Sequence, residues 1–498
     1  MPTILGANSV SGGYEISNSM RFNRGDAACL RKTFSGSPTS TKKCTISFWT
    51  KLADPFNTDG KAIFSAIKSG INEDFIKFMG VNNGILNSLE IGFNNTNSGA
   101  MMVSSGNSTL IKFRDPAAWY HFVIAIDSSQ GTASNRVKVY VNGTQFDVEA
   151  RVEGGSITDD IVLTQNYDLG FLTASKHQVG MNVENSGNEA YDGYISEFYF
   201  IDGQQLAPTS FAETDDNGIW VPKDVKDDLT FGNYGFFLEF KQTGTSQNSS
   251  GMGADTSGND NHFSTDNLAA KEVVVDTPTN NFIVMNPLYT NSRGSFTEGN
   301  TQVVTSVQGS VPYGQVEFGN MHLNTGKWYF EVRPTTVGSG GSLGLGVNER
   351  AYSGTYTNGH NNGGSSGNIR WNHANGNIVN GSQGSTSGST YANDDILGFA
   401  MDLDNYKIYC HKNGTYQNSG DPAAGSNGIT MTSAYEDYWT PWMSKDDTSN
   451  NATVDFNFGN PQFAISSSNS DANGYGNFEY AVPSGFYAIC TRNIAQYG

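Results

Sequence analysis

The chain has 498 residues, which is enough for roughly two to four domains, and its 58 glycines and 12% aromatic residues favour strands and turns over helices. Its 48 acidic residues outnumber 29 basic ones, and the net charge of −19 makes nucleic acid an unexpected partner. No apolar run approaches the ~20 residues of a membrane helix, and the first residues lack the features of a signal peptide. We expect a soluble chain without membrane insertion or export.

Short apolar segments recur at close intervals through the first half of the chain, which is typical of a β-sandwich. Residues 121–127 are apolar on both faces, so this segment is expected in the centre of a sheet. In the last segment, alternation predicts Tyr194, Ser196, Phe198 and Phe200 on one face and Ile195, Glu197 and Tyr199 on the other. The expected strands are residues 19–23, 44–52, 61–67, 74–81, 88–93, 119–127, 136–143 and 193–202.

The composition changes from residue 214 to residue 281, where Pro, Gly, Asn and Asp are frequent. We interpret this stretch as a turn-rich connector, with one expected strand at residues 235–240. Strands then resume and predict a second sandwich at residues 282–498, in which residues 338–388 form long loops. The second set of expected strands comprises residues 315–320, 327–334, 342–347, 395–404, 406–414, 454–460 and 485–493.

The same hairpin pattern occurs once in each half of the chain. Asn142-Gly143 and Asn413-Gly414 each end an apolar strand, and each of these strands follows another that closes with Asp. Because a type I′ turn needs positive φ at both central residues, Asn-Gly predicts a tight hairpin at both places.

These segments resemble known families. The first half, residues 14–213, is similar to the laminin-G-like, concanavalin A-like lectin/glucanase group through Ile46 to Trp49, Trp119 to His121, Tyr140 to Gly143 and Gly193 to Tyr199. The second half resembles a SPRY-type domain through residues 326–332, 395–414, 454–463 and 483–493. The resemblance implies an all-β chain of two concanavalin A-like jelly-roll sandwiches in tandem. The order of the domains, with residues 5–10, 201–213 and 255–263, resembles virion proteins of tailed, particularly marine, bacteriophages.

Motifs for catalysis are missing from the sequence. Glucanases of this fold group use an E-x-D-x-x-E strand, and no glutamate of this chain begins that pattern. The seven histidines are scattered without zinc-site spacing, and His121 is expected to be a satisfied strand residue. The four cysteines have no C-x-x-C spacing, so they are interpreted as small apolar strand residues, although a Cys29–Cys44 pair stays open. We therefore expect no enzyme.

Two groups of residues are candidates for binding. Tyr352, Tyr356, His360 and Trp371 lie in the long expected loops of the second half and could hydrogen-bond sugar hydroxyls or stack on sugar rings, or they could simply be solvated. Asp255, Asn259 and Asn261 offer oxygens that calcium accepts, but the same residue types also make consecutive turns through their own side chains. No cofactor other than this possible calcium is expected.

The resemblance favours a non-enzymatic tail fibre or appendage adhesin on the virion surface, recognising a host-surface glycan or protein. The alternatives are a capsid decoration or head-fibre protein without a ligand and, less favoured, a polysaccharide-degrading enzyme. The N-terminal arm, residues 1–13, contains no charged side chain, and Ile4 and Leu5 within it would gain nothing in water. We expect this arm to bind a neighbouring subunit or another virion protein, and the protein to be a homo-oligomer.

Overall fold

The computed structural model describes residues 13–56, 58–80, 87–93, 100–106, 109–151, 157–158, 163–183, 189–288, 294–305, 315–338, 343–348, 367–380, 384–432, 438–445 and 451–498. It is almost entirely β-structure, as the sequence predicts. The described part divides into one compact unit that ends at Thr279 and another that begins at Asn280. The boundary is close to the expected start of the second sandwich at residue 282.

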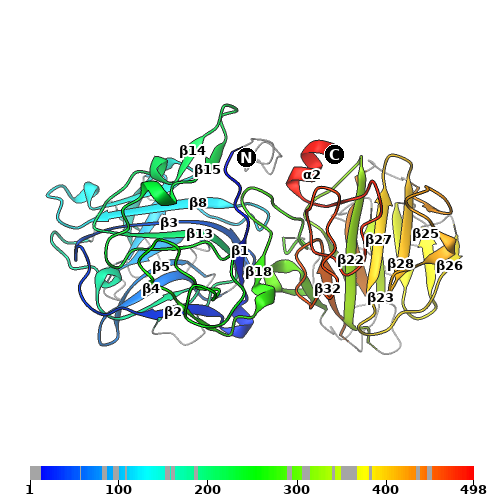
Figure 1. Ribbon diagram of the computed structural model, residues 1–498, viewed down its shortest axis with the longest axis horizontal. Coiled ribbons are helices and arrows are strands. Elements are labelled where there is room, and N and C mark those ends of the chain that lie inside the picture. Colours follow the sequence, from blue (N-terminus) through cyan, green and yellow to red (C-terminus); the bar gives the residue numbers. More distant parts are fainter. Residues whose placement is uncertain are drawn as a thin grey trace. The chain divides into compact units, whose positions relative to one another are not determined.

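The first unit is a sandwich of two antiparallel layers, seen in Figure 1 as β3, β8 and β13 above β4 and β5. One layer contains β1 (Ser19–Phe22), β3 (Lys43–Leu52), β8 (Tyr120–Asp127), β9 (Val137–Val141), β13 (Gly193–Asp202), β16 (Phe236–Leu238) and β18 (Val273–Val274). The other contains β2 (Cys29–Thr33), β4 (Lys61–Ser69), β5 (Asn72–Phe78), β6 (Leu89–Gly92), β7 (Ala100–Ser104), β12 (Lys176–Val179) and β17 (Ser264–Asp266).

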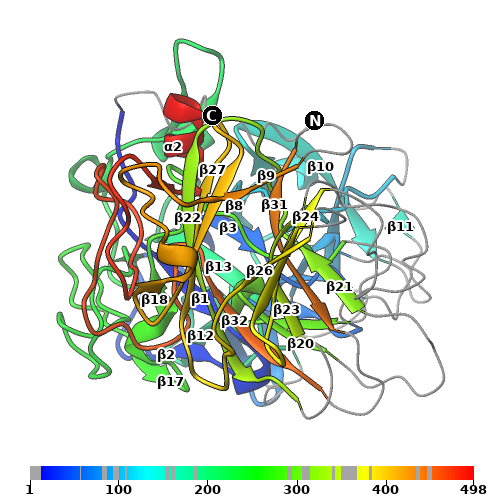
Figure 2. The same ribbon diagram turned by 90° about the vertical axis from the view of Figure 1, so that its right-hand side faces the viewer.

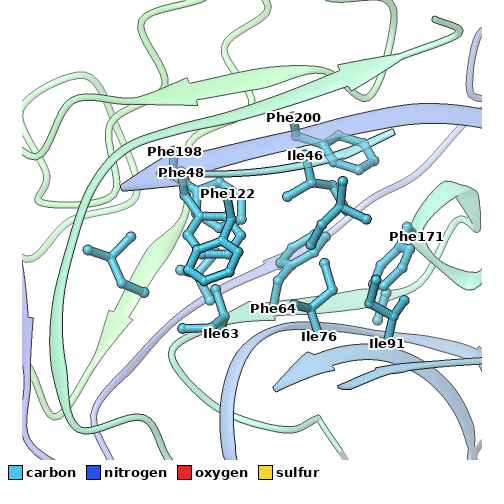
Figure 3. Close-up of a cluster of buried hydrophobic side chains, with 14 of the residues drawn as sticks. Ile46, Phe48, Ile63, Phe64, Ile76, Ile91, Phe122, Phe171, Phe198 and Phe200 are labelled. Carbon is cyan, nitrogen blue, oxygen red and sulfur yellow. The ribbon is translucent and has the colours of Figure 1, made fainter. Parts of the chain in front are cut away.

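The strand β10 (Thr144–Arg151) joins the two layers. Its first residues pair with β9, its later residues pair with β7, and β11 (Ile157–Thr158) pairs with its end. The core between the layers is rich in phenylalanine. In Figure 3, Phe48, Phe122 and Phe198 approach Ile63 and Phe64 from the opposite layer. The rings of Phe48 and Phe198 stack with centroids 5.6 Å apart.

The second unit is also a sandwich, whose layers can be followed in Figure 2 from β22 and β27 to β23 and β24. One layer contains β19 (Gly294–Thr297), β20 (Gln302–Thr305), β22 (Lys327–Thr336), β27 (Leu397–Asp402), β28 (Lys407–Lys412), β29 (Thr415–Tyr416), β30 (Ile429–Thr430), β32 (Thr453–Asn457) and β33 (Tyr487–Ala488). The other contains β21 (Gln315–Phe318), β23 (Leu343–Asn348), β24 (Asn368–Asn372), β25 (Asn377–Asn380), β26 (Ser385–Ser387) and β31 (Thr440–Lys445).

Helix is confined to short pieces in the described part of the chain. The α-helix α2 (Thr491–Tyr497) begins within the expected last strand, residues 485–493, where only β33 forms as strand. The 3-10 turns are η1 (Arg24–Asp26), η4 (Ala133–Asn135), η5 (Gly170–Leu172), η6 (Pro208–Ser210), η7 (Lys226–Asp228), η8 (Ala270–Glu272), η9 (Glu298–Asn300) and η10 (Gln417–Ser419). None of the described helices is long and apolar enough to cross a membrane.

The expected connector, residues 214–281, is wrong as a separate element. The strand β16 pairs with β13, β17 pairs with β2 and β18 pairs with β1, so the stretch completes the first sandwich. The pair β14 (Ala212–Thr214) and β15 (Trp220–Pro222) forms a further hairpin. Local composition missed this because the turn-rich sequence contains large apolar anchors, including Phe231, Phe237 and Phe263, that are buried.

The alternation expected in β13 is also wrong after Ser196. A β-bulge shifts the register between Ser196 and Tyr199, and the bulged Glu197 has a left-handed φ of 49°. As a result Ile195, Phe198 and Phe200 share the core, while Tyr199 joins a separate cluster on the other face.

Both predicted hairpins are confirmed. Val141 pairs with Thr144 and Lys412 pairs with Thr415, which leaves Asn-Gly as the two-residue loop in each case. The φ values are 47° and 79° at Asn142 and Gly143, and 49° and 82° at Asn413 and Gly414. Positive φ at both positions is the mark of a type I′ turn.

The central position expected for residues 121–127 is confirmed, because β8 lies between β3 and β9. All four cysteines are buried and free, so Cys29 and Cys44 are not bonded to each other. Their role as small apolar residues of the interior is confirmed.

Candidate functional site

The loop aromatics that the sequence nominates do not form a site in the described residues. Tyr352, Tyr356 and His360 lie outside those residues, as do Ile4 and Leu5. Trp371 is not on a loop: it lies on β24, fully buried, and its Nε1 donates to the Ser389 carbonyl at 3.0 Å. A ring in this position cannot stack on a sugar, so its expected role in ligand binding is wrong.

The error at Trp371 has a clear cause. The segment Asn368–Asn372 alternates, and both Ile369 and Trp371 point into the core of the second unit. Ile378 of β25 does the same. Isolated apolar residues at a spacing of two are enough to make short strands, so the expectation of long loops over residues 338–388, interrupted only at residues 369–371, is wrong in its described part.

The calcium candidate is a network of turns. Both carboxylate oxygens of Asp255 accept backbone N–H groups, those of Phe237 and Ser257 at 2.9 Å and that of Asn261 at 2.7 Å. The side-chain amides of Asn259 and Asn261 donate to the Gly235 carbonyl, both at 2.9 Å. The carboxylate oxygens of Asp255 are therefore already used as acceptors in the turns, and both asparagine side chains act as donors there. Among the described residues, no group of three or more His, Cys, Asp and Glu is placed to hold a metal.

A polar cluster that sequence reasoning missed lies on the outer face of the first unit, opposite the core. We call it the acidic face: Glu73 and Lys77 of β5, Glu90 of β6 and Glu149 of β10, with Asn182 and Glu189 from the loop after β12. Lys77 and Glu90 are cross-strand partners, and Met102 lies between Glu90 and Glu149 in the same row. The signal was present, because Ile76 and Phe78 of the same strand face the core and fix the alternate residues outward.

The acidic face is held together by charge. The Nζ of Lys77 lies 2.8 Å from Glu189 Oε1 and 3.9 Å from Glu90 Oε2. The amide of Asn182 donates to Glu73 at 2.8 Å and to Glu189 at 2.6 Å. Glu73, Glu90 and Glu149 are buried, and buried carboxylates need such a cation and such donors. Glu73, Lys77, Glu90, Asn182 and Glu189 match the hydrogen-bonding chemistry of sugar hydroxyls, but they are engaged with one another.

A second polar cluster lies beside the first hairpin. His121 is buried, and its ring stacks on that of Trp49 with centroids 4.6 Å apart. Its Nδ1 accepts a hydrogen bond from Trp220 Nε1 at 3.0 Å, and its Nε2 lies 2.9 Å from Ser47 Oγ. Because indole N–H can only donate, Nδ1 must be unprotonated and Nε2 carries the hydrogen. Burial lowers the pKa of His121 to about 3, so the ring is neutral. The expectation of a satisfied histidine is confirmed.

The second unit has a comparable cluster. The Nδ1 of His411 accepts from the Gly414 N–H at 3.2 Å, so Nε2 carries the hydrogen and donates to Tyr329 Oη at 2.8 Å. The Tyr329 hydroxyl then donates to Glu331 at 3.0 Å. Glu331 also accepts the backbone N–H groups of Glu479 and Tyr480 at 3.0 and 2.8 Å. This chain of groups fixes the segment that contains Glu479 and Tyr480 over β22.

Comparison with known proteins agrees with the fold of the first unit. Residues 25–204 match the family model of the concanavalin A-like lectin/glucanases superfamily. No curated protein matches the sequence. Solved structures with some likeness include the SPRY domain of human HERC1, at 13% identity over 31% of this chain and 87% of that one, with a TM-score of 0.24. The TRIM65 PSpry domain has 16% identity over 35% and 91%, with a TM-score of 0.26. A heptameric SAP-like pentraxin from Limulus polyphemus has 17% identity over 39% and 80%, with a TM-score of 0.25.

Proposed function

We propose that this protein is a non-enzymatic virion protein of a tailed bacteriophage, in which lectin-like sandwiches recognise a glycan or protein on the host surface. The match of residues 25–204 to the concanavalin A-like lectin/glucanases superfamily carries the proposal of binding. The missing E-x-D-x-x-E motif supports binding over hydrolysis. The phage assignment rests on the resemblance of the sequence and on the order of its domains.

A purified full-length chain tests the binding activity on a glycan array and on intact candidate host cells. Saturable binding to one class of glycan supports an adhesin. Saturable binding to cells that survives removal of their glycans indicates a protein receptor. The alternative, a capsid decoration or head-fibre protein without a ligand, predicts binding to neither, while the protein is still found in particles.

Two measurements test the location on the virion surface. Mass spectrometry of purified particles should contain the chain, and labelled antibodies should decorate tails rather than heads. Deleting residues 2–12 tests the assembly arm: the truncated chain should fold but fail to enter particles. Normal incorporation of the truncated chain would contradict a role of Ile4 and Leu5 in attachment.

A further inference from the structure

Glu197 is a buried carboxylate held in an unfavourable backbone conformation. It lies at the bulge of β13 with a φ of 49°, a left-handed conformation that is uncommon outside glycine and asparagine. The bulge places both Glu197 and Tyr199 away from the core, and only 3% of Glu197 is exposed. Such a residue persists only where the surrounding contacts determine its conformation.

Glu197 contacts the first described residues of the chain, residues 13–18, which we call the N-terminal segment. The hydroxyl of Tyr14 donates to Glu197 Oε1 at 3.2 Å, and that of Tyr199 donates to Oε2 at 2.7 Å. Ile16 and Asn18 are held by groups without charge. Ile16 exchanges two hydrogen bonds with the Thr279 hydroxyl, at 3.1 and 3.3 Å, and the Ser196 hydroxyl donates to the Asn18 carbonyl at 2.7 Å.

Glu197 faces a second carboxylate across this contact. Glu239, directly after β16, is mostly buried and raises the pKa of Glu197 by repulsion, although Lys241 at 2.5 Å from Glu239 offsets part of that effect. Burial is the larger cause, and together they raise the pKa of Glu197 to about 7. The titratable and charged groups that act on Glu197, Tyr14 and Glu239 are Tyr199, Lys241, Asp224 and Lys226.

We propose that Glu197 is a proton-controlled clasp, which holds the N-terminal segment when the carboxyl group is protonated and loosens it when the group is ionised. A protonated carboxyl still accepts the Tyr14 hydroxyl on one oxygen, so this contact survives in acid. The ionised form must keep a charge out of water beside Glu239, and it gains hydration only when the segment lifts away. The segment is therefore held more weakly as the pH rises through neutrality.

Hydrogen exchange of the full-length chain tests the clasp, with each rate in residues 13–18 divided by its intrinsic rate at the same pH. If release returns Glu197 to its ordinary pKa of 4.5 from about 7, the population of the released segment should rise about tenfold between pH 6 and pH 8. Protection of β3, in the middle of its layer, should not change over this range, because the core contacts do not titrate with Glu197.

Substitutions separate the clasp from a general effect of pH. Glu197→Gln keeps the size of the side chain and removes the charge, so protection of the segment should become independent of pH. Tyr14→Phe leaves both carboxylates in place and should lower protection at every pH. An unchanged tenfold response in Glu197→Gln, or the absence of any response in the unsubstituted chain, would overturn the proposal. Should Glu197→Gln fail to fold, Glu239→Gln provides the second test, since removing the repulsion must lower the pKa of Glu197 and shift the response to lower pH.

Discussion

Asn142 binds the backbone of His121 in both directions: its Oδ1 accepts the His121 N–H at 2.8 Å, and its own N–H donates to the His121 carbonyl at 2.9 Å. Asn413 makes the same two contacts with Ile396, both at 2.8 Å. In each unit the turn asparagine thus extends the pairing to the neighbouring strand. This explains the repeated sequence pattern: the asparagine both tolerates positive φ and provides the acceptor.

Asn142→Ala and Asn413→Ala should therefore each destabilise their own unit by about 1–3 kcal/mol, because a backbone N–H loses its acceptor and alanine disfavours positive φ. Replacement by glycine keeps the backbone freedom and removes only the hydrogen bonds of the side chain, so it should lower stability less. Urea denaturation followed by tryptophan fluorescence measures these differences. Equal stability of the alanine and glycine variants would show that backbone conformation is unimportant at these turns.

Gly398 makes room for the ring of His411 on the outer face of β27. A Cβ at this position would overlap the imidazole, which is fixed by Tyr329 and the Gly414 N–H. We expect Gly398→Ala to destabilise the second unit by about 2 kcal/mol or more, a cost typical of overpacking and broken buried networks. Gly131→Ala is the matched control, since the nearest atom to its Cβ would be 3.9 Å away. A thermal shift equal to that of the control would contradict this packing.

His411 should also make the stability of the second unit depend on pH. Burial lowers its pKa from 6.5 to about 4, so the unfolded chain binds a proton in this range that the folded chain does not. The contribution of His411 to the free energy of unfolding is fully present above pH 6.5. It falls as the pH decreases toward 4, by up to about 3 kcal/mol. Unfolding free energies of the unsubstituted chain and of His411→Gln, measured from pH 4 to pH 7, should converge in acid as this contribution is lost. If the unfolding free energies of the two proteins ran parallel from pH 4 to pH 7, His411 would not be the cause of the pH dependence.

The sequence predicted those features that local chemistry decides. Asn-Gly with flanking strands identified both hairpins, and the wholly apolar run before Asp127 identified a central strand. It failed where long-range packing decides. Glu197 at the bulge is contacted by the distant Tyr14, and the pairing of β16 with β13 brings together residues far apart in the chain. Trp371 was misplaced because the glycine-rich composition around it concealed a pattern of two alternating apolar residues.

Enzymatic activity is a separate matter from fold, and we expect none on β-glucans or other common polysaccharides. Hydrolysis needs a protonated and an ionised carboxyl group on either side of the scissile bond. On the acidic face, the carboxylate of Glu189 is instead bound by Lys77 and Asn182. A reducing-sugar assay with purified protein should stay at background. Sugar release that a single substitution such as Glu90→Gln abolishes would contradict this expectation and favour the glucanase side of the superfamily.

The buried ion pair between Lys51 of β3 and Asp276 tests whether the supposed connector is part of the first sandwich. Both side chains are almost completely excluded from solvent, and Asp276 also accepts from Trp119 Nε1 at 3.2 Å. Desolvation lowers the pKa of Lys51, although Asp276 counteracts part of this effect. Asp276→Asn would leave a buried ammonium without its counter-ion, so we expect a loss of about 3–5 kcal/mol from the first unit. Replacing both partners, as in Lys51→Met with Asp276→Leu, should recover most of that loss, because no uncompensated charge then remains. Denaturation of the unsubstituted chain and of the two variants measures the difference. A mild effect of Asp276→Asn would mean that residues 273–279 can leave the sandwich without exposing its core, as a true connector would.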